Sequence, residues 1–128
     1  VAVLQHLVFE VPGATAPWTV QVRIARRSSG ALRKDAYQNA IRLYARVAMR
    51  GDPPMTGPVA LNFGFYIREN ADKRRGDLTN LQKCAEDALQ GIVIGDDRQV
   101  VSVESALHLQ AETDRTVIEA RQVPAATG

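Results

Sequence analysis

The stretch from Gly57 to Arg68 constrains the fold more than any other part of the sequence. Apolar residues recur there at every second position, which places them on one side of an extended chain: Val59, Leu61, Phe63, Phe65 and Ile67. Strict alternation of this kind is typical of a β-strand with one buried face. Such a strand needs neighbouring strands and a layer that covers its apolar side, so we expect a sheet with helices packed against it.

Other segments supply the rest of this sheet and its covering layer. The spacing of apolar residues predicts helices at 33–50 and 78–90, and strands at 7–13, 19–24, 100–107 and 116–123. The predicted order of elements is therefore β-β-α-β-α-β-β. We interpret residues 1–128 as a single α+β domain in which two main helices pack on a small mixed sheet, with residues 124–128 as a frayed tail.

The first predicted helix carries two different faces. Its apolar residues form a stripe that we expect to face the core: Ala36, Tyr37, Ala40, Ile41, Tyr44, Val47 and Ala48. Arg42, Arg46 and Arg50 recur at every fourth position and lie on another face. The second helix has a simpler pattern, and its expected core residues are Leu81, Ala85, Ala88 and Leu89, with Gly91 as the C-terminal cap.

Positive charge is concentrated in one part of the chain. Residues 23–50 hold eight arginines and lysines against one acid, Asp35, although the formal net charge of the whole chain is only +2. This asymmetry suggests a side that faces a polyanion such as DNA. A charged helix surface without a nucleic-acid partner would show the same pattern, so the sequence leaves both explanations open.

The single cysteine and the hydropathy pattern limit where the protein works. Cys84 is the only cysteine, so a disulfide within the chain is impossible and a reducing compartment fits. Its position within a predicted helix favours a small buried side chain over a nucleophile. No run of about 18 apolar residues is present. We therefore expect a soluble, cytoplasmic protein without a membrane span.

Acidic residues flank the second predicted helix on both sides. Asp77 precedes the helix, which rises roughly 18–20 Å, and an extended segment from Ile92 would return about 16 Å to Asp96 and Asp97. The chain therefore has the reach to bring the three carboxylates together. Converging carboxylates repel one another unless a cation neutralises them, so this arrangement favours a metal site. Asp77 is equally suited to capping the helix, and that role alone would explain it.

Polar residues on the exposed side of the same helix belong to this group by their spacing. Asn80, Lys83 and Asp87 lie three and four residues apart and so share one helix face. Lys83 can form a simple ion pair, or its ammonium can hold a phosphate and stabilise a departing oxyanion. Glu86 and Asp87 are interpreted as a solvated surface that balances the lysine, and only as reserve ligands.

The segment from Arg75 to Val100 resembles the RusA family of Holliday-junction resolvases. The similarity is carried by Arg75-Gly-Asp-Leu-Thr-Asn-Leu-Gln-Lys83, by Asp87-Ala-Leu-Gln-Gly91 and by Asp96-Asp-Arg-Gln-Val100. A weaker similarity covers Phe9-Glu-Val-Pro-Gly13. The resemblance implies a homodimeric, Mg²⁺-dependent endonuclease, with Mn²⁺ as a substitute ion, that cuts four-way DNA junctions in recombination and repair. It also implies a bacterial protein, commonly encoded by a phage or prophage, without an organic cofactor.

The same resemblance implies roles for particular residues. Asp77 and Asp97 match the metal-binding acids of the family, Asp96 matches a companion acid, and Lys83 matches an essential lysine. Asp77, Lys83 and Asp97 would then be catalytic, with Thr79, Asn80 and Asp87 around them. The basic residues expected to bind DNA lie in two segments: Arg23, Arg26 and Arg27, and Lys73, Arg74 and Arg75. Phosphate contacts of this kind predict recognition of branched shape rather than of base sequence.

Two positions depart from the family pattern. Thr79 stands where the family usually has a second aspartate, and Gly76 stands where many members have a basic residue or proline. A neutral hydroxyl is a poorer magnesium ligand than a carboxylate. An alternative interpretation is therefore a protein that binds branched DNA and cuts it weakly or not at all. A third is a small α+β module whose acids are only helix caps and surface charges.

Overall fold

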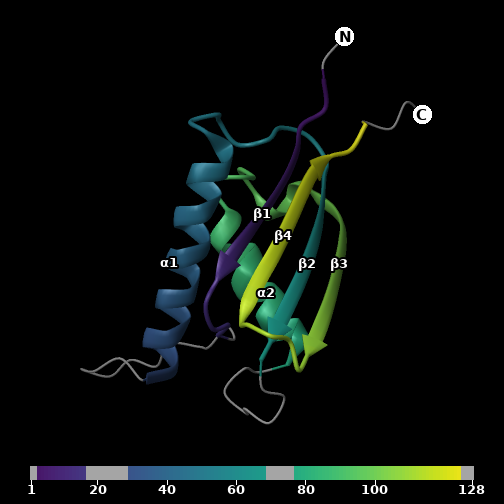
Figure 1. Cartoon of the computed structure of the whole chain (residues 1–128). Helices are drawn as coiled ribbons and strands as arrows, with labels where there is room; N and C mark the ends of the chain where they lie inside the picture. Colours follow the sequence, from purple (N-terminus) through teal and green to yellow (C-terminus); the bar gives the residue numbers. More distant parts are fainter. Residues whose placement is uncertain (1–2, 17–28, 69–76, 125–128) are drawn as a thin grey trace.

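The computed structural model describes residues 3–16, 29–68 and 77–124. Its elements are β1 (His6–Pro12), α1 (Ser29–Met49), β2 (Val59–Ile67), α2 (Leu78–Leu89), the short 3-10 helix η2 (Asp97–Gln99), β3 (Val100–Leu109) and β4 (Arg115–Gln122). Both long helices lie on the same face of a four-stranded sheet (Figure 1). The predicted α+β class is confirmed. The strand predicted at 19–24 lies outside the described residues.

The sheet is mixed, as predicted, and its strand order is β1-β4-β2-β3. β2 pairs with β3 in parallel, while β4 is antiparallel to both β1 and β2. Parallel neighbours cannot be joined by a tight hairpin, because the chain must cross from one end of the sheet to the other. In this protein α2 lies within that crossover, and the acidic residues of interest stand at its two ends.

The alternating segment became a central strand. β2 lies between β4 and β3, and the inward positions Val59, Leu61, Phe63, Phe65 and Ile67 are all buried. They pack against the buried face of α2, whose residues are Leu81, Cys84, Ala85, Ala88 and Leu89. The predicted inner faces of this strand and of this helix are confirmed. This shared core fixes α2 on the sheet and leaves its polar face toward solvent.

The apolar stripe predicted for α1 is partly wrong. Tyr37 and Ile41 are buried as expected, but Tyr44 is 38% and Val47 69% exposed, whereas Ala45 and Met49 are buried. The buried arc is rotated because α1 packs against α2 as well as against the sheet. Gln38 lies in that contact, where its Nε2 donates to the Cys84 carbonyl at 3.0 Å. The hydrogen bond offsets the cost of burying a polar amide.

A second buried polar contact joins α1 to the sheet. The hydroxyl groups of Tyr37 and Thr116 lie 2.6 Å apart, and both residues are almost fully buried. Burial raises the pKa of Tyr37, since the charged phenolate would lose its hydration. The pair therefore remains neutral and fixes α1 relative to β4. Among the described residues, no helix is long and apolar enough to cross a membrane.

Candidate active site

α2 begins at an acid that its own backbone uses. The Asp77 carboxylate accepts a hydrogen bond from the Asn80 backbone N–H at 2.9 Å, which makes Asp77 the N-cap residue. The helix-capping role considered for this residue is therefore confirmed. A cap satisfies one of the amide groups left open at a helix start, and it places the carboxylate at the positive end of the helix dipole.

A second group of acids lies at the end of α2. Glu86 and Asp87 are half-buried on the polar face of the helix, and burial raises the pKa of both carboxyl groups. The Asp97 carboxylate raises both pKa values further, so Asp97 lies within electrostatic reach of both. The structure thus gathers Glu86, Asp87 and Asp97 at one end of the helix. Glu86 and Asp87, expected only as reserve ligands, thus interact electrostatically with Asp97, whose side chain also interacts with Asp96.

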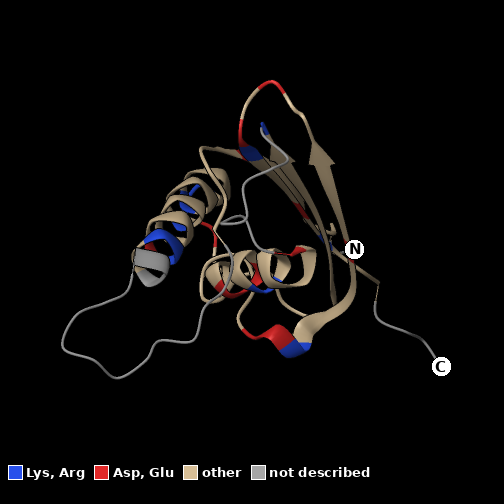
Figure 2. Cartoon of the chain, turned by 90° about the horizontal axis from the view of Figure 1, so that it is seen from below, with Lys and Arg blue, Asp and Glu red and all other residues tan. Residues whose placement is uncertain are grey.

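Three cations face these acids from two helices. Lys83, one turn before Asp87 on the same face of α2, lowers the pKa of Asp87, as do Lys34 and Arg42 of α1. The pKa of Asp87 is nevertheless raised overall. The three cations therefore lower this pKa by less than burial and Asp97 together raise it. The site therefore combines carboxylates that repel one another with positive groups at its border. Figure 2 shows Lys and Arg along α1, with Asp and Glu on α2 and η2 beside it.

Asp96 is held by the residue two positions later. Its Oδ1 accepts from the Arg98 backbone N–H at 2.9 Å, and its Oδ2 accepts from Arg98 Nε at 3.1 Å and Nη2 at 2.9 Å. These hydrogen bonds lower the pKa of Asp96. Both oxygens of the predicted companion acid thus have a partner within the same turn. Asp97 extends from the first residue of η2 and is exposed.

Gln99, which was not among the predicted site residues, fixes this acidic turn to the rest of the protein. Its Nε2 donates to the carbonyls of Met55 at 2.8 Å and Gly57 at 2.9 Å. Its Oε1 accepts from the backbone N–H groups of Gly95 at 2.8 Å and Asp96 at 3.0 Å. The side-chain amide has two donors and one double acceptor, and all are used here. A Gln three residues after an Asp was the available sequence signal, since it forms a capping box.

The path from α2 to Asp97 differs from the extended return expected from the sequence. Residues 91–93 form a turn, Gly91 has a φ of +84°, and Ile94 forms isolated bridges with Met55 and Gln90. The chain therefore turns back at once because Gly91 adopts a backbone conformation that few other residues tolerate. Asp97 consequently lies beside the end of α2. Asp77 is ten residues before Asp87, or about 15 Å along the helix axis.

Of the predicted metal ligands, Asp77 thus lies at the start of α2, whereas Asp96 and Asp97 lie at the start of η2. Among the described residues, no three His, Cys, Asp or Glu side chains lie close enough together to hold one ion. Thr79 and Asn80 are exposed in the first turn, and Lys83 is exposed midway along the same face. The predicted DNA-binding residues of both basic segments, Arg23 to Arg27 and Lys73 to Arg75, lie outside the described residues.

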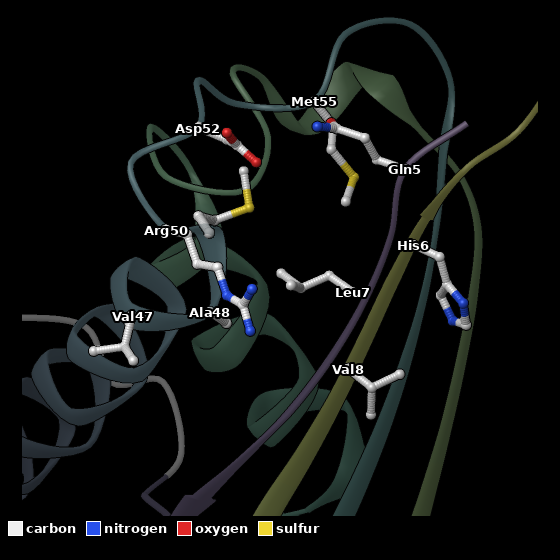
Figure 3. Close-up of a pocket in the computed structure, with 10 residues that line it drawn as sticks. Gln5, His6, Leu7, Val8, Val47, Ala48, Arg50, Asp52 and Met55 are labelled. Carbon is white, nitrogen blue, oxygen red and sulfur yellow. The ribbon is translucent and has the colours of Figure 1, made fainter. Parts of the chain in front are cut away.

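Two further features of the structure lie away from these acids. Cys84 is buried, and burial raises the pKa of its thiol to about 12, which confirms the expectation of a structural cysteine. A hollow of about 560 Å³ opens between the end of α1 and β1, lined among others by Leu7, Val47 and Arg50 (Figure 3). None of the predicted site residues lines it, so it is separate from the candidate site.

Carboxylates, a lysine and flanking cations are the residue types that metal-assisted cleavage of a phosphodiester requires. The model of the family described as endodeoxyribonuclease RusA matches residues 17–121 of this sequence. The chain therefore belongs to the RusA family of endodeoxyribonucleases, which act on Holliday junctions, as the resemblance predicted. No curated protein matches the sequence.

Proposed function

We propose that this protein is a homodimeric, Mg²⁺-dependent endonuclease that resolves four-way DNA junctions by paired nicks. The observation that carries this proposal is that Asp97 lies within electrostatic reach of Glu86 and Asp87, and Lys83 of Asp87, in a chain of the RusA family. The acids and the lysine come from two segments that only the fold brings together. Because of its family, we also propose that the protein is encoded by a phage or prophage and acts in the bacterial cytoplasm.

The chemistry of the donor set fits Mg²⁺. This ion prefers oxygen ligands and is commonly held by one or two carboxylates and substrate phosphates, with water completing its shell. Burial is the main cause of the raised pKa values of Glu86 and Asp87, and the Asp97 carboxylate adds a repulsion that a bound cation would relieve. Asp97, exposed at the start of η2, is the proposed ligand at this end of α2. The resemblance also implies Asp77 as a ligand, but Asp77 caps the opposite end of the helix, so it is not proposed to share the same ion within one chain. Asp96, whose oxygens already bind Arg98, would assist by orienting the turn.

The chain's own residues would divide the work on the phosphate. A bound Mg²⁺ would polarise the phosphate and lower the pKa of an attacking water. Lys83 would place its ammonium beside the same phosphate and stabilise the charge that develops on the departing oxygen. Gln99 would keep Asp97 in position through its bonds to Met55 and Gly57. The basic segments 23–27 and 73–75 are proposed to hold the flanking strands.

A homodimer would match the symmetry of the substrate. A four-way junction offers two equivalent strands, and a two-fold axis would present one acidic site to each of them. The experiment is to incubate the purified protein with a synthetic four-way junction and MgCl₂, and to map the cuts on both strands. Symmetric nicks that require the metal would support the proposal. An uncut junction over a wide range of protein and Mg²⁺ concentrations would contradict it.

The second candidate is a protein that binds branched DNA but has lost most of its chemistry. Thr79 favours it, because this exposed residue lies one turn before Lys83 and supplies a hydroxyl where the resemblance implies a carboxylate. Thr79→Asp distinguishes the two candidates. If the wild type binds tightly without cutting and this variant cuts, the binding protein is correct. If the wild type cuts, Thr79 is compatible with catalysis.

A further inference from the structure

One edge of α1 carries polar and basic residues at every fourth position. Lys34, Gln38, Arg42 and Arg46 follow one another along the helix. Gln38 is buried and bonded to the Cys84 carbonyl, so this edge faces α2. Each step of four residues rises about 6 Å and turns the side chain by about 40°. Successive side chains of the row therefore point progressively away from α2. Gln38 is buried, Arg42 is half-buried and Arg46 is exposed.

The row begins at the acidic site. Lys34 and Arg42 both lower the pKa of Asp87, which places their charges within electrostatic reach of the Glu86, Asp87 and Asp97 group. Arg42 is also oriented locally, because its Nη1 donates to Asn39 Oδ1 at 3.1 Å. Beyond Arg42 the row continues to Arg46, in the last turn of the helix. Positive charge thus extends from the acids along one side of α1.

We infer that this edge, formed by Lys34, Arg42 and Arg46, binds the phosphate backbone of the junction beside the acidic site. We call it the α1 cationic edge, and the inference rests on the proposed function. Acids at the site repel a polyanion, so phosphates on either side must be held by positive groups. Along the helix axis, Lys34 and Arg42 are about 12 Å apart and Arg42 and Arg46 about 6 Å apart. These spacings are close to four and two nucleotides at roughly 3.4 Å each along a duplex axis.

A simpler explanation accounts for part of this pattern. An arginine in the last turn of a helix interacts favourably with the helix dipole, and this would explain Arg46 without DNA. That explanation predicts a loss of stability when Arg46 is removed, and no change in DNA affinity. It also does not account for the continuation of the row through Arg42 to the acidic site.

The test compares two double variants that lose the same charge. Arg42→Gln with Arg46→Gln removes two members of the α1 cationic edge. Arg33→Gln with Arg121→Gln is the control, because Arg33 is an exposed α1 residue that borders a different hollow with Pro12 and Tyr37, and Arg121 is exposed on β4. Binding of a labelled four-way junction is measured by fluorescence anisotropy in EDTA over a series of salt concentrations. Circular dichroism checks that all variants are folded.

We expect the edge variant to bind about tenfold more weakly, with the slope of log K against log salt reduced by about 1.8 units for two lost phosphate contacts. The control should stay within about twofold of the wild type. Equal weakening of both variants, or no weakening of either, would overturn the inference even if the wild type cuts DNA. A wild type that binds but never cuts would refute the proposed nuclease, while the comparison of variants would still decide the role of the edge.

Discussion

At the start of α2 the exposed Asp77 carboxylate accepts a hydrogen bond from a backbone amide, whereas at its end Glu86 and Asp87 are half-buried beside Asp97. The first acid is stabilised by the helix itself. The second group is destabilised by burial and by mutual repulsion, which its bordering cations only partly offset. Binding of a cation or of a phosphate-bound metal would therefore be more favourable at the end of the helix than at its start. The same carboxylate group is therefore structural or reactive according to the groups that surround it: a backbone amide at the start of α2, and burial with another acid at its end.

Asp97→Asn should have the largest effect on function. It removes the negative charge on η2 that acts on Glu86 and Asp87 of α2, and it keeps the shape of the side chain. We expect cleavage of a four-way junction to fall about 1,000-fold, with binding in EDTA unchanged or slightly tighter. Glu112→Gln, at an exposed turn, is the matched control. Full activity of the Asp97 variant would show that the cleavage site does not lie at the end of α2.

Lys83→Ala tests whether the lysine midway along α2 takes part in the cleavage step. If its ammonium stabilises the departing oxygen, single-turnover cleavage at saturating DNA should slow about 100-fold. Lys83→Arg should recover part of the rate, since it retains the charge with a different shape. A change in affinity alone, with an unchanged single-turnover rate, would assign Lys83 to DNA binding.

Gln99→Ala tests the support of the acidic turn. Loss of its four hydrogen bonds leaves backbone groups of Met55, Gly57, Gly95 and Asp96 without this partner. We expect a loss of about 1.5 kcal/mol in the free energy of unfolding, or roughly 4–6 °C in Tm by calorimetry, and slower cleavage. Gln90→Ala, at the exposed end of α2, is the control. Unchanged cleavage in a destabilised Gln99 variant would separate stability from positioning.

Two substitutions at Asp77 separate capping from chemistry. Asn is as good an N-cap as Asp, so Asp77→Asn should keep the stability of the wild type, while Asp77→Ala should lose about 1 kcal/mol. Thermal unfolding measures this difference. If Asp77 also binds the metal, both variants should lose cleavage equally. Cleavage that follows stability, lower only in the Ala variant, would restrict Asp77 to the cap.

Glu86→Gln should have the smallest effect, and it should be stabilising. The pKa of Glu86 is raised by burial and by Asp87 and Asp97, so its charge costs folding energy at neutral pH. After solvent screening we expect a gain of about 0.5 kcal/mol at pH 7. The gain should disappear as the pH falls below about 4, where the carboxyl group of the wild type is protonated in both the folded and unfolded states. A gain that persists at pH 3 would point to packing instead.

Local patterns were sufficient for the elements of this fold and for part of its site. Alternation located β2 and its inner face, and the acid before Leu78 marked the start of α2. The orientation of α1 could not be predicted, because Tyr44 and Val47 are as apolar as the residues that replaced them in the core. The role of Gln99 was also missed, since its partners Met55 and Gly57 lie more than 40 residues away in sequence.

The sequence by itself determined the α+β class, the extent of α2, the Asp77 cap and, through the segment from Arg75 to Val100, the RusA family. These depend on spacing between near neighbours, which the sequence states directly. The start of α1 was predicted four residues too late. Only the tertiary structure decided that Asp97 lies by Glu86 and Asp87, and that α1 turns Lys34 and Arg42 toward them. Such contacts depend on how a turn at Gly91 and a helix-helix packing place distant segments, because electrostatic interactions act through space and not along the chain.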